Sequence, residues 1–221
     1  MKVGIVSDIH SNQTALEATF SDMSDVDKIV CCGDIVGYGP RPKKCLEMVK
    51  EKCSVIVQGN HDRNVESPSN YRSNNVAYKG LQHSRESLAQ EEIEWLSELP
   101  KRTSYNSYLV AHSHPTDTGK YVYPRQFDRL IEYANSNGHD GVVLGHTHIQ
   151  HHKEVDGVFC LNPGSVGQPR DDDTRSAYAV VDTNDNSVDL RRVSYDIGQT
   201  IERIQDEGLP RRSGSRLRSG K

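Results

Sequence analysis

The sequence predicts an α/β fold, on three observations. Short apolar segments with strand character alternate with segments that carry apolar residues at helical spacing, which is typical of α/β proteins. The 221 residues are enough for one sizeable hydrophobic core. Hydrophobic residues make up 34% of the chain and charged residues 26%, which lies within the globular range. We therefore expect a single domain over residues 1–208.

The expected elements follow from this alternation. Five strands are expected, from KVGIV (residues 2–6), DKIVCC (27–32), SVIVQ (54–58), SYLVAHSHP (107–115) and GVVLGHTH (141–148). Helices are expected at residues 12–20, 42–52, 126–136 and 197–205. Pro42 suits the first turn of the second helix. Residues 63–100 are polar, with apolar positions at helical spacing, and we expect a helical, lid-like segment there.

After residue 150 the pattern becomes antiparallel. HHKEV and VFCLNPGS flank Asp156-Gly157, a dipeptide that indicates a β-hairpin, and AYAVVD with SVDLRRVSY forms a second antiparallel pair. Residues 209–221 contain five cationic residues, no acid and few apolar residues, so they are predicted to be a disordered basic tail.

Charge and hydropathy exclude several classes of protein. The formal net charge of −4 gives no basic face that would predict nucleic-acid binding. No segment approaches the roughly 18 apolar residues of a membrane span, and MKVGIV lacks the apolar core of a signal peptide, so we expect a cytoplasmic protein without membrane contact. The five cysteines form no C-x-x-C pair and are interpreted as buried apolar residues.

Side chains that can bind a metal follow each of the five expected strands. Ligands of open α/β sheets gather at the carboxyl ends of strands, so these side chains are expected to converge. The set is Asp8, His10, Asp34, Asn60 with His61, His112, and His146 with His148. If the fifth strand stays extended through GHTH, His146 and His148 leave the same face. Any one of these residues alone is more often a structural hydrogen-bonding group, and the prediction depends on the whole set.

These motifs, in this order, resemble those of the calcineurin-like metallophosphoesterase superfamily, in particular its small prokaryotic phosphodiesterase-like branch. The matching stretches are DIH, GDIVGYG, GNHD, the histidine of AHSHP, and GHTH, and the resemblance extends from Met1 to about Asp182. It implies a four-layer αββα sandwich of two mixed sheets flanked by helices. The hairpins after His148 are expected to complete the second sheet.

The resemblance also implies a role for each matching residue. One metal would be held by Asp8, His10 and His148, and a second by Asn60, His112 and His146, with Asp34 bridging the two. His61 would be the general acid, and Asp62 would orient its ring. HSHP departs from the HGSP that is common in this branch, so His114 remains an alternative to His112.

The implied activity is hydrolysis of a phosphate ester by a metal-dependent phosphodiesterase or phosphatase. Two cations roughly 3.5–4 Å apart activate a bridging hydroxide for attack on phosphorus. Mixed imidazole and carboxylate ligands suit two divalent transition metal ions, such as Mn, Fe, Zn or Ni. Protonation of the leaving group by His61 would contribute about 10²–10⁴-fold in rate.

Substrate and alternatives stay open at this stage. Asn12 and Arg63 are candidates for binding a phosphate oxygen, or are a helix cap and a solvated charge. Members of the family act on small phosphorylated substrates that include nucleotides and dinucleoside polyphosphates, and on phosphoproteins. The alternative function is a non-catalytic scaffold or partner-binding protein, as in the retromer subunit of this fold that has lost the catalytic histidine. A purely structural zinc site would need only four ligands.

Overall fold

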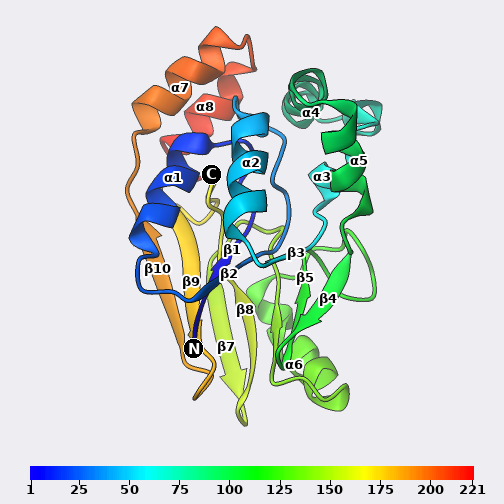
Figure 1. The fold of residues 1–221 in the computed structure, drawn as a ribbon, viewed down its shortest axis with the longest axis vertical. Coiled ribbons are helices and arrows are strands. Elements are labelled where there is room, and N and C mark those ends of the chain that lie inside the picture. The colour runs from blue at the N-terminus through cyan, green and yellow to red at the C-terminus, as the bar shows by residue number, and fades with distance from the viewer.

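Two mixed five-stranded sheets form the centre of the protein in the computed structural model, which describes residues 1–221 (Figure 1). The first sheet has the order β10-β9-β1-β2-β3, with β1 (Lys2–Val6), β2 (Lys28–Cys31), β3 (Val55–Ile56), β9 (Ser176–Asp182) and β10 (Val188–Val193). The second sheet has the order β4-β5-β6-β8-β7, with β4 (Arg102–Tyr105), β5 (Tyr108–Ala111), β6 (Gly141–Val143), β7 (His151–Val155) and β8 (Val158–Asn162). The predicted α/β sandwich of two mixed sheets is confirmed.

Helices cover the outer faces of both sheets. They are α1 (Gln13–Asp22), α2 (Pro42–Lys52), α3 (Asn60–Asn64), α4 (Asn75–Ser87), α5 (Gln90–Glu98), α6 (Phe127–Ser136), α7 (Ile197–Asp206) and α8 (Arg211–Leu217), with short 3₁₀ helices at Pro68–Tyr71 and Pro124–Gln126. None of them combines the length and the apolar character that a membrane crossing requires.

The period-two alternation of the strands separates the layers. In β1, the side chains of Val3 and Ile5 pack between the sheets with Phe159 of β8, whereas Val6 packs outward in a cluster that includes residues of α1 and α2. The opposite face of the second sheet is covered by α6, whose buried residues include Phe127. Three apolar layers therefore hold the four structural layers together.

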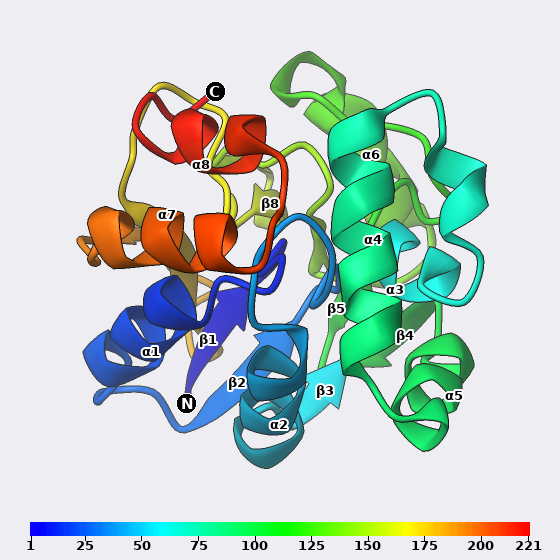
Figure 2. The ribbon, with the colours of Figure 1, turned by 90° about the horizontal axis from the view of Figure 1, so that it is seen from above.

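Parallel strands bring the chemically important loops to one edge. β1, β2 and β3 run parallel to each other in the first sheet, and β5, β6 and β8 do so in the second. Their carboxyl ends lie at the same edge of each sheet. Viewed from above, α7 and α8 lie to one side of these ends and α3 and α4 to the other (Figure 2).

Residues 63–100 pack firmly against the rest of the domain. Leu81 of α4 and Ile93 and Leu96 of α5 are buried in the large cluster outside the first sheet. Other residues of the segment, Arg63 and Tyr71 among them, line the cavity at the carboxyl ends of the strands. The segment expected to be lid-like is thus a packed wall of this cavity.

Two sequence-based expectations about the residues after 150 differ from the structure: the sheet that the second hairpin joins, and the disorder of the basic segment. The hairpin β7–β8 joins the second sheet as expected, with Asp156 and Gly157 both at positive φ (52° and 78°). The hairpin β9–β10, however, joins the first sheet, where β9 pairs antiparallel with β1. A local pattern predicts that two strands pair with each other, but not which sheet they extend.

The basic segment from residue 209 is not a disordered tail. It forms α8, and Leu217 is buried with Ile204 of α7 in a small apolar cluster. Gly214 allows close packing, because a β-carbon there would lie 3.2 Å from a side-chain carbon of Ile201. The end of the chain is also fixed to the loop after β8, since the Asp172 amide donates to the Gly220 carbonyl at 3.0 Å.

Candidate metal centre

The predicted metal-binding residues lie in tight loops that begin where the strands end. Five of them have left-handed backbones, with φ of 52° at Asp8, 46° at His10, 55° at Asp34, 71° at His146 and 60° at His148. Such conformations cost about 1–3 kcal/mol each in residues other than glycine and are concentrated at functional sites. β6 ends at Val143, so the expectation that an extended strand aligns His146 and His148 is wrong. The loop backbone brings them together instead.

Two motif glycines are required by close approaches. A β-carbon at Gly59 would overlap the Asp34 carboxylate, and one at Gly37 would overlap the ring of His61. Gly37 also has a φ of 93°, which side chains rarely adopt. These glycines of GNHD and GDIVGYG let the carboxylate and the imidazole lie directly against the backbone.

The first group of predicted ligands consists of Asp8, His10 and His148. The Nε2 atoms of His10 and His148 lie 3.1 Å apart, and Oδ1 of Asp8 lies 3.3 Å from Nε2 of His148. This Oδ1 atom is buried and has no hydrogen-bond partner. All three residues are at most 2% exposed.

Backbone carbonyls determine which ring nitrogen carries the hydrogen. Nδ1 of His10 donates to the Val36 carbonyl at 3.1 Å, and Nδ1 of His148 donates to the Gln168 carbonyl at 2.6 Å. Burial, followed by neighbouring positive groups, lowers the pKa of both rings well below the ordinary value, so both are neutral. Their two Nε2 atoms therefore present lone pairs to each other with no hydrogen between them. A cation is the group that would relieve this arrangement.

The second group consists of Asn60, His112 and His146. Nδ1 of His112 donates to the Cys32 carbonyl at 2.8 Å, and its Nε2 lies 3.4 Å from Oδ2 of Asp34 and 3.1 Å from Oδ1 of Asn60. The Asn60 amide nitrogen donates to the Tyr71 hydroxyl at 2.6 Å, which turns Oδ1 toward His112.

His146 completes this group with the opposite ring orientation. Its Nε2 donates to the Gly119 carbonyl at 3.1 Å, which leaves Nδ1 as the acceptor. Asp34, His112 and His146 offer ligand atoms that lie within 4.8 Å of one another, as do Asp8, His10 and His148.

Asp34 lies between the two groups. Its Oδ2 atom is 3.4 Å from Nε2 of His112 and 3.7 Å from Nε2 of His10. Burial opposes the negative charge of Asp34, but His112 and His61 outweigh burial and hold its pKa well below the ordinary value. A carboxylate at this position can contact cations in both groups.

His61 lies at the floor of the same cavity. Its backbone N–H donates to Oδ1 of Asp34 at 2.7 Å, and its ring lies 4.8 Å from that of His10 and 4.7 Å from that of Tyr38. Nδ1 is buried without a partner and lies against Gly37, and the residue lines the cavity. Burial lowers the pKa of this ring to about 4.

The expected contact between Asp62 and the ring of His61 is wrong. Both Asp62 oxygens accept hydrogen bonds from backbone amides instead, from Asp34, Ile35, Val36 and Gly59 at 2.8–3.3 Å. Asp62 thus joins the loop after β2 to the start of α3. Its influence on the site is through the position of Asp34.

The two candidates for phosphate binding have different surroundings. Asn12 is 2% exposed, its Oδ1 caps α1 by accepting from the Ala15 amide, and its Nδ2 donates to the Gly167 carbonyl at 2.9 Å. It is a helix cap and does not line the cavity. Arg63 lines the cavity and forms no ion pair. His114 lies outside the cluster, where its Nδ1 contacts Thr116.

The cavity at the strand ends has a volume of about 240 Å³ and contains residues that the motifs did not identify. The most informative is Arg170, whose Nη2 donates to Gln168 at 2.9 Å and which forms no ion pair with a carboxylate. Its Nε atom is buried without a partner, and its guanidinium lies 5.7 Å from the ring centre of Tyr38. Arg170 comes five residues after the NPGS turn (Asn162–Ser165), and this position is the feature of the sequence that could have identified it. Tyr38, Tyr71, Asn74 and Tyr121 also line the cavity.

The NPGS turn supports the GHTH loop from below. The Asn162 side chain donates to the Gly145 carbonyl at 2.7 Å, and the Ser165 hydroxyl donates to the Asp8 carbonyl at 2.7 Å. These bonds connect the loop after β8 to the loops after β6 and β1. The turn therefore has a structural role.

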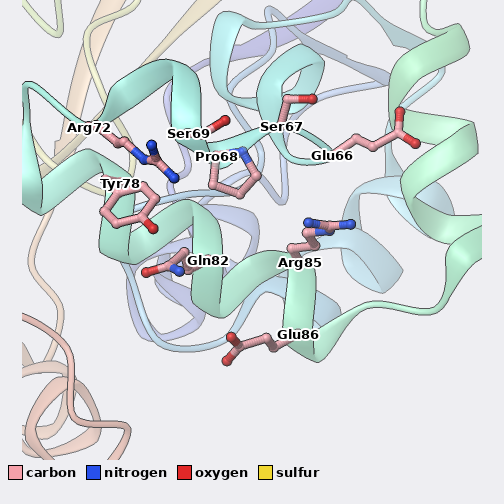
Figure 3. Close-up of a pocket in the computed structure, with 9 residues that line it drawn as sticks. All are labelled: Glu66, Ser67, Pro68, Ser69, Arg72, Tyr78, Gln82, Arg85 and Glu86. Atoms are coloured by element: carbon pink, nitrogen blue, oxygen red, sulfur yellow. The ribbon is translucent and has the colours of Figure 1, made fainter.

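A larger hollow of about 540 Å³ lies between residues 66–72 and α4 (Figure 3). Arg72 and Arg85 face it together with Glu66 and Glu86, so charges of both signs line it. It contains none of the predicted metal-binding residues. Several of these residues line the smaller cavity instead.

The chain matches the calcineurin-like phosphoesterase superfamily domain over residues 1–186, and it belongs to this superfamily. It is 31% identical over 245 residues to an uncharacterized protein of Methanocaldococcus jannaschii, with 99% of this chain and 98% of that protein covered.

Two solved structures resemble the whole chain. The crystal structure of a metallophosphoesterase from Sphaerobacter thermophilus is 30% identical, with a TM-score of 0.87 over 100% of this chain and 99% of that one. A hypothetical protein from Pyrococcus horikoshii has the same fold, with a TM-score of 0.88 at 20% identity over 100% of this chain and 98% of that one. These likenesses extend over α7 and α8 as well as the sheets.

Proposed function

We propose that the protein hydrolyses a phosphate ester, with two divalent transition metal ions held by the first and second groups of ligands. The observation that carries this proposal is the pair of neutral imidazoles, His10 and His148, whose acceptor nitrogens face each other at 3.1 Å beside an unpartnered Asp8 oxygen. Imidazole nitrogens and carboxylate oxygens suit Mn, Fe, Zn or Ni. Each ligating ring also donates to a backbone carbonyl, which fixes its orientation as in other metal sites.

The bound cations would supply Lewis acidity toward the phosphate oxygens and the attacking water. Hydrolysis adds water to phosphorus and breaks the ester P–O bond, and the leaving oxygen then needs a proton. His61 lines the cavity and is the proposed donor, through Nε2 because Nδ1 lies against Gly37. Burial lowers the pKa of this ring to about 4, and the negative charge of a bound phosphate would favour its protonated form.

Arg170 and Arg63 are the proposed phosphate-binding residues. Both line the cavity, and neither forms an ion pair within the chain. A guanidinium can donate two parallel hydrogen bonds to phosphate oxygens. A cavity of about 240 Å³ with these cations fits a small phosphorylated substrate. Whether a diester or a monoester is preferred depends on groups beyond the phosphate.

The test combines metal analysis with activity. Purified protein loaded with Mn²⁺ should contain about two metal ions per chain and hydrolyse bis-p-nitrophenyl phosphate or p-nitrophenyl phosphate. His61→Ala should retain both metal ions and lose about 10²–10⁴-fold in kcat. His114→Ala is the matched control, since it removes an imidazole outside the cluster and should retain both metal and rate.

A scaffold function predicts a different result. If the folded protein binds metal but hydrolyses no phosphate ester with any of the four metals, and His61→Ala changes nothing, catalysis is excluded. If the folded protein takes up no metal at all, the proposed site itself is wrong. Circular dichroism of each preparation establishes that the chain is folded.

A further inference from the structure

We propose that Tyr121 and Tyr123 form a stacking surface for the base of a nucleotide, which makes nucleotides the substrate class of this site. The inference rests on the proposed phosphoesterase function. It arises from a pair of solvent-exposed aromatic rings that stack on each other, one of which lines the cavity.

The rings form a continuous stack that starts at the metal centre. The Tyr121 ring lies 4.0 Å from that of His146, centre to centre, with 21° between the planes. The Tyr123 ring lies 5.9 Å from that of Tyr121, with 13° between the planes. Tyr121 lines the same cavity as Asp34 and Arg170. The surface thus extends outward from the place where the phosphate would bind.

Both rings are open to solvent. Tyr121 is 45% exposed and Tyr123 is 39% exposed, and neither hydroxyl forms a hydrogen bond within the chain. The chain has only five large hydrophobic residues this exposed, and two of them are this stacked pair. The other three, Met1, Val155 and Leu190, lie at the amino terminus, in the β7–β8 hairpin and on β10. Exposed apolar surface beside a catalytic cavity indicates a ligand-binding surface.

The backbone holds the pair in place. Val122, between the two tyrosines, is 4% exposed and belongs to the apolar cluster beneath α6. The same loop provides the Gly119 carbonyl that accepts from His146, and the Gly119 amide donates to the Ser113 hydroxyl at 2.7 Å. A fixed surface loses little conformational freedom when a ring binds to it.

Positively charged side chains lie on both sides of the Tyr121–Tyr123 pair, and this arrangement suits a molecule with an anionic end and an aromatic end. Arg170 lies in the cavity, and the Arg125 guanidinium lies 6.0 Å from the ring centre of Tyr123. A nucleotide has a phosphate at one end and a planar base at the other. Stacking of a base on an aromatic side chain typically changes affinity by about 5- to 150-fold on removal of the ring.

The experiment compares two monoesters that differ only in the base, adenosine 5′-monophosphate and ribose 5-phosphate, with the Mn²⁺-loaded protein. The wild type should prefer the nucleotide in kcat/KM by at least about tenfold. Tyr123→Leu should lower this preference by about tenfold or more, through KM. Tyr123→Phe keeps the ring and should keep the preference. Tyr78→Leu, a change in the separate hollow of Figure 3, is the matched control and should not alter the ratio.

Equal kcat/KM for the two esters in the wild type, with no change in Tyr123→Leu, overturns the inference and leaves the proposed hydrolase intact. A phosphotyrosine peptide that depends on Tyr123 when the nucleotide does not also overturns it, in favour of an aryl phosphate. If neither ester is hydrolysed, calorimetric titration with both ligands decides. Tighter binding of the nucleotide that is lost in Tyr123→Leu supports the surface, and equal binding rejects it.

Discussion

The two groups of predicted ligands differ in how they carry protons. In the first group, His10 and His148 are neutral, and burial raises the pKa of Asp8 to about 6. In the second group, burial disfavours a charged His112, but Asp34 and Asp8 outweigh burial and raise its pKa to about 9. In the second group a proton on His112 can therefore balance the Asp34 carboxylate, whereas the lone pairs of the first group face each other.

This difference indicates what each group needs from a metal. In the second group a cation has to replace the proton of His112. In the first group no proton has to be displaced, because the Nε2 atoms of His10 and His148 face each other with no hydrogen between them. Asp34 connects the two groups, since its Oδ2 is within 3.7 Å of a ring nitrogen in each.

The largest effect is expected from Asp34→Asn, because this change removes the negative charge that both groups share. We expect loss of metal from both groups and a fall in kcat of about a thousandfold or more, measured by elemental analysis and phosphoesterase assay. Asp25→Asn, at an exposed pair with Arg191, is the matched control and should retain both. Full metal content in Asp34→Asn would show that the groups are independent.

A smaller effect, confined to the second group, is expected from His112→Ala. The metal affinity of the second group should fall by more than about a hundredfold. Mutation of a residue that only hydrogen-bonds to a metal ligand already lowers metal affinity by about 10- to 100-fold. The first group should still bind one ion per chain, as measured by competition with a metal indicator. Loss of the second ion in His114→Ala rather than in His112→Ala would shift the assignment to His114.

The pH dependence of metal binding should separate the groups further. Below pH 9 a metal entering the second group displaces the proton of His112, so affinity should rise by about tenfold per pH unit from pH 7 to pH 9 and then level off. Over the same window the first group should change little, because its rings are neutral and the pKa of Asp8, about 6, lies below it. Equal slopes for the two ions, in competition titrations across this range, would contradict the distinction.

The smallest effect is on stability. A metal ion at about 100 times its Kd stabilises the folded state by about 2.7 kcal/mol, and for a chain of this size each kcal/mol corresponds to about 2–4 °C. Chelation of both proposed ions should therefore lower the Tm by about 11–22 °C, as measured by calorimetry. An unchanged Tm after complete removal of a bound metal would indicate that the metal does not contact these buried groups.

Much of the site could be predicted because its residues follow the ends of strands. Asp8, Asp34, Asn60 and His112 follow short apolar strands, and parallel strands bring such ends together whatever the details of the loops. The backbone at His146 and His148 was not predictable in this way. An apolar run followed by a histidine pair looks like a continuing strand, and only the tertiary structure imposes φ values of 71° and 60° there.

The residues that sequence reasoning missed depend on long-range packing. Arg170 and Tyr121 lie in irregular loops, and their place beside the metal centre follows from bonds such as that between His148 and the Gln168 carbonyl. For the same reason α8 was mistaken for a tail, because the contact of Leu217 with Ile204 cannot be read from a run of arginines. The partner sheet of β9 was also outside what a local pattern specifies.

The most direct test of the central claim is anomalous diffraction at the manganese edge from crystals grown with Mn²⁺. Two peaks are expected, one bounded by Asp8, His10 and His148 and the other by Asn60, His112 and His146, with Asp34 between them. A single peak, no peak, or peaks outside this cavity would contradict the claim.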